Sequence, residues 1–284
     1  MNKQCQVKLD RLIFTAVPRD KAGIGNVAGF RRVSDFRPQP QAKLRTYERV
    51  LKLRCTTTSC EIVVQHDPQL PWLAPVRITI IGDDLTGVTP EVIEGVISQC
   101  HHHTITLVEL AFDFPPESNV DQDFVRRHGR FGKSRCRTDR GGPGTLRYGG
   151  RACPKLIRCY FKNTLDRYRV EAEIHCSLLR RFGAMKVGDL GDIAAKLVPA
   201  HVKFSCVRWT KLDAYLTRKF GKDGTRICEE ARRRTESSLR AAIRYLAKNG
   251  VVNPHRFLGS LRINRDVREA LWRWAKDFAP DQWE

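Results

Sequence analysis

The chain has 284 residues, and its 51 Lys and Arg against 31 Asp and Glu give a net charge of +20 at pH 7. Hydrophobic residues make up 41% of the sequence, which is typical of a globular protein, and no apolar run approaches the ~18 residues of a membrane helix. The composition therefore argues against a membrane protein and predicts a polyanionic partner, most often nucleic acid. The first residues lack the apolar core and cleavage site of a signal peptide, so we expect a cytoplasmic protein.

Hydrophobic patterning predicts a strand-rich first part and a helical last part. Residues 18–45, rich in Pro, Gly and basic side chains, are expected to form a long loop. Strands are predicted over residues 7–17, 49–55, 60–66, 76–82, 104–114 and 202–209, and helices over 89–100, 177–185, 191–198, 228–248 and 265–277. This order predicts an α+β fold, with an antiparallel sheet domain over 1–205, flanking helices, and a helical C-terminal region over 206–284.

The ten cysteines include no Cys-x-x-Cys pair, so the common zinc-ribbon and thioredoxin-like spacings are absent. Cys55 and Cys60 form a looser pair without a matching second half. We therefore expect scattered, reduced cysteines.

The positive charge is concentrated between residues 126 and 158, where eleven Lys and Arg face one acid, Asp139. Such a segment suits a phosphate backbone. We expect it to form a flexible basic loop over 126–151. The candidate DNA-binding residues are Arg126, Arg127, Arg130, Lys133, Arg135, Arg137, Arg140, Arg147 and Arg151.

The stretch from residue 156 to residue 176 predicts a β-hairpin with a polar face. Alternate residues of a strand share a face. One strand therefore presents Arg158, Tyr160 and Lys162, and the other presents Arg169, Glu171, Glu173 and His175. A turn over 163–168 would pair Tyr160 with Glu171 and Arg158 with Glu173. The upstream strand 104–114 adds Glu109 and Asp113 on one face.

These side chains predict a metal-dependent phosphoryl-transfer site. Carboxylate oxygens are the ligands that Mg²⁺ and Mn²⁺ prefer, so Glu109, Asp113, Glu171 and Glu173 are the candidate metal ligands. Tyr160 beside such an ion would attack a phosphate, with Arg158 and Lys162 stabilising the developing charge. The alternative interpretation is a solvated sheet face with cross-strand ion pairs.

The order of these motifs resembles the Rep-trans family of rolling-circle replication initiators of plasmids and filamentous phages. The matching parts are Tyr148-Gly149-Gly150-Arg151, then Arg158-Cys159-Tyr160-Phe161-Lys162, then Arg169-Val170-Glu171-Ala172-Glu173. Glu109 and Asp113 stand where the family has Asp-x-Ala-x-Asp. The family's Ser after Gly-Gly is missing here, and Glu109 replaces an Asp.

The resemblance implies an enzyme that nicks one strand of a double-stranded origin and stays joined to the 5′ phosphate through a tyrosine. It implies Tyr160 as the nucleophile, Arg158, Lys162 and Arg169 as phosphate contacts, and Mg²⁺ or Mn²⁺ as cofactor. It further implies catalysis within 1–205, DNA recognition or dimerisation within 206–284, a homodimer, and a host helicase and polymerase as partners in a bacterial cytoplasm.

Several alternatives stay open at this point. Tyr148, Tyr168 and Tyr245 are rival nucleophiles. The triple His101-His102-His103 is expected in a surface turn and does not match the His-hydrophobic-His metal motif of other rolling-circle nucleases. A non-catalytic DNA-binding protein and a plasmid mobilisation relaxase are the competing functions.

Overall fold

A computed structural model describes residues 4–20, 24–36, 47–131, 136–138, 144–150 and 153–278. About 40% of the chain is helical and 35% is in strands, with a large antiparallel sheet, flanking helices and C-terminal helices. The α+β prediction is therefore confirmed. No described helix is long and apolar enough to cross a membrane.

The described part of the chain forms one ten-stranded sheet in the order β2-β3-β4-β5-β1-β6-β10-β9-β8-β7, with antiparallel neighbours throughout. The two longest strands, β1 and β6, lie side by side at its centre. The strands are β1 (Gln6–Pro18), β2 (Phe30–Phe36), β3 (Tyr47–Cys55), β4 (Glu61–Pro68), β5 (Val76–Ile81), β6 (Cys100–Phe114), β7 (Cys136–Thr138), β8 (Leu146–Tyr148), β9 (Lys155–Lys162) and β10 (Arg167–His175).

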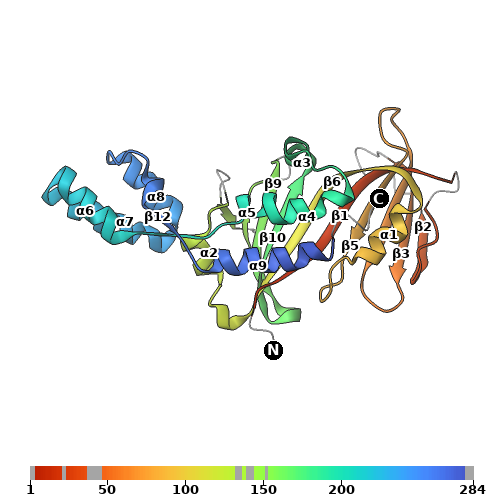
Figure 1. The fold of residues 1–284 in the computed structure, drawn as a ribbon, viewed down its shortest axis with the longest axis horizontal. Helices are drawn as coiled ribbons and strands as arrows, with labels where there is room; N and C mark the ends of the chain where they lie inside the picture. The colour runs from red at the N-terminus through yellow and green to blue at the C-terminus, as the bar shows by residue number, and fades with distance from the viewer. Residues whose placement is uncertain are drawn as a thin grey trace.

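One face of the sheet is covered by helices (Figure 1). These are α1 (Pro90–Ile97), α3 (Cys176–Phe182), α4 (Leu190–Asp192), the π-helical turn η4 (Ile193–Leu197), α5 (Val198–His201) and α9 (Ile263–Lys276). Apolar side chains that alternate along the strands, such as Phe112 and Val170, pack there against Ile193 and Leu271 in one continuous core. Single 3₁₀ turns occur at η1 (Pro116–Ser118), η2 (Asn163–Leu165), η3 (Val187–Asp189) and η5 (Pro254–Phe257).

Three helices project from one end of the sheet as an arm (Figure 1). They are α6 (Trp209–Phe220), α7 (Lys222–Ser237) and α8 (Leu239–Lys248), and they enclose a second core that includes Leu212, Ala231 and Leu246. At the base of the arm, β11 (Ser205–Val207) pairs with β12 (Leu258–Ser260), while α2 (Gln122–His128) contacts α7 and α8. The chain then returns through α9 to the core of the sheet, so 206–284 contributes to both cores.

The structure corrects several predicted elements. The expected loop over 18–45 contains strand β2, and residues 37–46 lie outside the described residues. His101-His102-His103 belongs to β6 instead of a turn. The predicted strand 202–209 is reduced to β11, which pairs outside the large sheet.

The described parts of the basic segment 126–151 include a helix and two strands that the loop prediction did not contain. Arg126 and Arg127 are on α2, Arg137 is in β7 and Arg147 is in β8. Lys133, Arg135, Arg140 and Arg151 lie outside the described residues.

The predicted helix 228–248 is two helices that meet at Ser238. Ser238 has an extended backbone, and its hydroxyl accepts a hydrogen bond from the Ala241 N–H at 3.0 Å. This is the N-cap geometry that serine favours, and it outweighs the continuous helical pattern on either side.

We expect Ser238→Ala to lower the free energy of unfolding by about 1 kcal/mol, because α8 would lose its capping acceptor. Urea denaturation would measure the change. Ser237→Ala is the matched control, since the Ser237 hydroxyl only donates to the Arg234 carbonyl within α7. An equal effect of both substitutions would contradict the capping role.

Candidate active site

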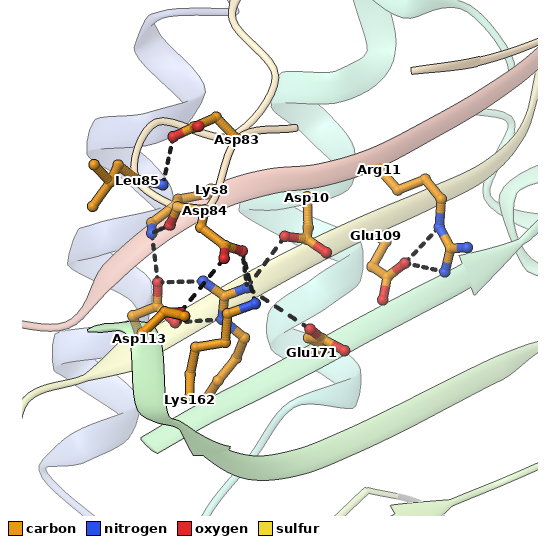
Figure 2. A network of polar contacts seen from close by, with 12 residues as sticks. Lys8, Asp10, Arg11, Asp83, Asp84, Leu85, Glu109, Asp113, Lys162 and Glu171 are labelled. Atoms are coloured by element: carbon orange, nitrogen blue, oxygen red, sulfur yellow. Dashed lines mark hydrogen bonds and ion pairs between the residues drawn. The ribbon is translucent and has the colours of Figure 1, made fainter. Parts of the chain in front are cut away.

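Four adjacent strands, β1, β6, β10 and β9, carry charged side chains on the face opposite the apolar core (Figure 2). Alternation along β6 places Glu109 and Asp113 together on this face, on either side of Ala111. Along β10 it places Arg169, Glu171 and Glu173 there. The predicted same-face sets are confirmed. Three of its carboxylates are shielded from solvent, because Glu109 and Asp113 are 0% exposed and Glu171 is 3% exposed.

The predicted hairpin register is wrong by two residues. Tyr160 lies opposite Arg169, and Arg158 lies opposite Glu171. The cause is a shorter turn: η2 and a left-handed Asp166 (φ 50°) close the hairpin, so β10 begins at Arg167. Tyr160 still reaches Glu171 diagonally, and its hydroxyl donates a hydrogen bond to Glu171 Oε1.

Strand β1 adds charged residues that the sequence analysis did not assign to the site. Lys8 lies opposite Ala111 and Arg11 lies opposite Glu109, so Asp10 is the extra residue of a β-bulge. The bulge is hydrogen-bonded to the residue that follows β5, since the Gly82 N–H donates to the Asp10 carbonyl at 2.8 Å. The feature of the sequence that could have revealed these residues is the presence of three charged side chains in a mostly apolar strand. Simple alternation would have found Asp10 but placed Arg11 on the wrong face.

Asp10, Glu109 and Glu171 form the group best suited to hold a metal ion. One carboxylate oxygen from each lies within 4.8 Å of the others, and the three residues come from three neighbouring strands. An all-oxygen donor set of this kind fits Mg²⁺ or Mn²⁺. Of the four predicted ligands, the structure therefore brings Glu109 and Glu171 together and adds Asp10.

Asp113 and Glu173 lie outside that group and have other partners. Asp113 accepts hydrogen bonds from Arg169 Nε at 2.6 Å and Nη2 at 3.0 Å, and it pairs with Lys8 at 2.7 Å. Glu173 lies 2.7 Å from His175 Nε2 and 3.2 Å from Arg11 Nη2. Lys8 and Arg169 thus neutralise Asp113, and Arg11 neutralises Glu173.

Arginines bridge the remaining carboxylates. Arg158 hydrogen-bonds Glu109, and its Nε lies 2.9 Å from Glu171 Oε2. Arg11 Nε donates to Glu109 at 2.7 Å from the other side. Glu109 on β6 and Glu173 on β10 lie directly opposite each other, and these contacts offset the repulsion between their like charges.

Arg169 and Lys162, both expected to contact phosphate, also lie within this network. Arg169 is 1% exposed, and its Nη1 lies 3.3 Å from Asp10 and 3.8 Å from Asp84. Lys162 Nζ pairs with Asp84 at 2.8 Å (Figure 2). Asp84 belongs to the loop after β5, which therefore folds over this end of the site.

The pKa values show that the cations do not fully compensate the carboxylates. Burial, and then repulsion by Glu109, raises the pKa of Glu171 to about 7, although Arg158 opposes the shift. The pKa of Asp10 is raised by the same two causes. The Tyr160 pKa is raised by burial and by the Glu171 carboxylate, so this phenol needs a base to ionise near neutral pH.

The other predicted residues lie away from this cluster. Tyr168 is buried on the apolar side, and Tyr245 is on α8 beneath Arg234. His103 accepts a hydrogen bond from the Val187 N–H at 3.1 Å, and burial lowers its pKa. Arg126, Arg127 and Arg130 lie on and just after α2, towards the arm.

A scan against protein-family models finds no match to this sequence, and a search of curated proteins returns no significant relative. Chemistry is therefore inferred from the side-chain geometry and the motif pattern.

Glu171 should make stability depend on pH. Because its folded-state pKa is raised from 4.5 to about 7, the folded protein binds more protons than the unfolded chain in that window. The contribution of Glu171 is complete below pH 4.5 and is lost as pH rises through 7. We expect wild type to lose roughly 2–3 kcal/mol more than Glu171→Gln between pH 5 and pH 8 in EDTA.

Urea denaturation at a series of pH values would measure this difference. Glu269→Gln, a change at an exposed position of α9, is the matched control and should leave the profile of wild type unchanged. Parallel profiles for wild type and Glu171→Gln would contradict a raised pKa.

Arg169→Met should destabilise the fold by about 3–5 kcal/mol, because it leaves Asp113 buried with Lys8 as its remaining cation. The triple variant Arg169→Met/Asp113→Leu/Lys8→Met should recover much of that loss, because Lys8 pairs with Asp113 and would otherwise be left buried without a carboxylate. Arg226→Met, which breaks an exposed pair with Asp223, should change stability by no more than about 0.5 kcal/mol. Calorimetric unfolding of all three variants would test the dependence of Asp113 on Arg169.

Proposed function

We propose that the protein nicks and rejoins one DNA strand by tyrosine transesterification, as a rolling-circle replication initiator of the type that the motifs resemble. One observation carries the proposal: the Tyr160 hydroxyl donates to Glu171 within a cluster of three convergent carboxylates. A nucleophile bonded to a base of suitable pKa, next to a site for a divalent cation, is what phosphodiester attack requires.

Glu171 is suited to be the general base for Tyr160. Its Oε1 accepts the phenolic hydrogen bond, while Oε2 lies 2.9 Å from Arg158 Nε in an ion pair without hydrogen-bond geometry. Without a bound cation its pKa is about 7, so it takes up a proton near neutral pH more readily than an ordinary glutamate. The hydrogen bond also orients the phenol, which the raised Tyr160 pKa keeps protonated until attack.

In the proposed step, Tyr160 Oη bonds to phosphorus as the P–O3′ bond breaks. The phenolic proton passes to Glu171, and the departing 3′ oxygen takes a proton from solvent. Attack of that 3′ hydroxyl on the phosphotyrosine reverses the reaction and rejoins the strand. A divalent cation bound by Asp10, Glu109 and Glu171 would supply charge neutralisation for the phosphoryl oxygens.

The cations at the edge of the cluster suit a polyanionic substrate. The side chains of Arg158 and Lys162 are 27% and 23% exposed, so both can reach a phosphate next to Tyr160. Arg147 lies opposite Arg158 in β8 and extends the basic strip along the same face. Double-stranded origin DNA and its nicked strand are the proposed substrates, with a homodimer, a host helicase, a polymerase and a bacterial cytoplasm as the setting.

A non-catalytic DNA-binding protein is the second candidate. It is favoured by the extent to which Arg11, Arg158 and Arg169 already neutralise the carboxylates, since a purely structural ion-pair network has that form. A mobilisation relaxase would share the tyrosine chemistry and differ in the DNA site it cuts.

Tyr160→Phe should abolish a covalent DNA–protein adduct, formed with Mn²⁺ and supercoiled DNA of the protein's own replicon and detected after denaturation. We expect a loss of at least about a thousandfold, because the attacking oxygen is removed. Glu171→Gln should slow adduct formation by about 10²–10⁴-fold without weakening DNA binding.

Tyr168→Phe is the matched control, because the buried Tyr168 hydroxyl has no hydrogen-bond partner in the described structure. Its adduct should equal that of wild type. An adduct that persists in Tyr160→Phe would move the nucleophile to another tyrosine. Tight DNA binding with no adduct in any variant would favour the non-catalytic protein.

A further inference from the structure

A second candidate site lies at the base of the arm, away from the carboxylate cluster. It is a cavity of about 580 Å³ where α5, residues 202–205, β12 and α9 converge. No residue of the carboxylate cluster lines it. Its walls come from the helices that cover the apolar face of the sheet and from the strand pair that carries the arm.

The cavity is lined by basic side chains and by no acidic one. The basic residues are Arg130, Lys196, Lys203, His255 and Arg268. Lys196 pairs with Asp192 at 2.8 Å, whereas Arg130, Lys203 and Arg268 have no side-chain hydrogen bond or ion pair among the described residues. On the catalytic face, by contrast, Arg11, Arg158 and Arg169 each contact a carboxylate. Cations that converge without a counter-charge mark a site for an external anion.

The walls are fixed before any ligand binds. Arg130 N–H donates to the Lys203 carbonyl at 2.7 Å, so their side chains start from neighbouring backbone positions. The Asn264 side chain bonds both backbone groups of Phe204, accepting from its N–H at 2.7 Å and donating to its carbonyl at 2.5 Å. These bonds tie residues 203–204 to α9, which carries Arg268. A preorganised site loses less entropy when it binds its ligand.

The pKa values of two histidines, one lining the cavity and one beside it, are lowered by burial and by the nearby cations. The pKa of His255 is lowered by burial and by Arg130. His201, whose Nδ1 lies 2.9 Å from Lys155 Nζ, has a pKa lowered to about 4 by burial, Lys155 and Lys203. No carboxylate offsets either shift, which agrees with the unpaired cations found from the contacts.

We infer that this cavity binds phosphate groups, and that their main source is the backbone of DNA. The inference deepens the proposed function and rests on it for the identity of the DNA, but not for the anion chemistry. Several cations spread over the walls suit the repeated charges of a phosphodiester chain. A DNA strand bound in this cavity would contact the sheet domain and the base of the arm at the same time. A free nucleotide or pyrophosphate is the other source of the same group.

The test compares Lys203→Gln/Arg268→Gln with Arg180→Gln/Arg181→Gln, which removes the same charge from exposed positions on α3. All four residues are exposed, so the fold should survive in both variants. Fluorescence anisotropy would measure binding of a labelled duplex of arbitrary sequence over a series of NaCl concentrations in EDTA. Calorimetric titration with inorganic pyrophosphate would be run in parallel.

We expect the cavity variant to bind the duplex more weakly and to reduce the log–log salt slope by about 2, since each lost phosphate contact contributes about 0.9. The α3 variant should keep the slope of wild type. If both variants keep the salt slope of wild type but only the cavity variant loses pyrophosphate binding, the site binds a free phosphate compound. That result would overturn the proposal that the phosphate groups come from DNA. If neither ligand distinguishes the variants, the phosphate site itself is overturned. Because no nicking is measured, failure of Tyr160 chemistry would leave these outcomes unchanged.

Discussion

The structure depends on neutralising carboxylates that are buried on one face of a sheet. Taking a carboxylate out of water costs several kcal/mol, and only close cations and hydrogen bonds offset that cost. Here Arg169 satisfies Asp113 with two hydrogen bonds, while Arg11 and Arg158 hold Glu109 from opposite sides. The four central strands are therefore joined by their polar face as well as by their backbone ladders and apolar core.

The cations neutralise some of the buried carboxylates better than others, and the less neutralised carboxylates lie next to Tyr160. Asp113 is fully paired, whereas Asp10 and Glu171 have raised pKa values because burial and neighbouring carboxylates outweigh the nearby guanidinium groups. A purely structural network has no need of an undercompensated pair next to a phenol. Titratable groups with shifted pKa values concentrate at functional sites, which favours the catalytic proposal over the non-catalytic one.

Local patterning was enough to predict the sheet, most strands, helix α9 and the residues of β6, β9 and β10 that share the polar face. It failed where one residue changes the geometry. The four-residue connection 163–166 moved the hairpin register by two, and the bulge at Asp10 brought Arg11 onto the polar face. Ser238 divided a continuous helical pattern because its cap is a local hydrogen bond that periodicity does not register. The depth of burial of Glu109 depends on arginines from β1 and β9, which are distant in sequence.

The pairing of β11 with β12 brings together the two points where the chain enters and leaves the arm. Val207 lies opposite Leu258, so about fifty intervening residues begin and end side by side. Their apolar contacts form a core of their own, and α9 completes the sheet domain afterwards. In evolutionary terms the arm has the form of an insertion: its sequence can vary, apart from the parts of α7 and α8 that contact α2, while the strands that carry Tyr160 and its carboxylates stay in place. Under the proposed function, a change in what the arm binds and preservation of the Tyr160 site would then be separable under selection.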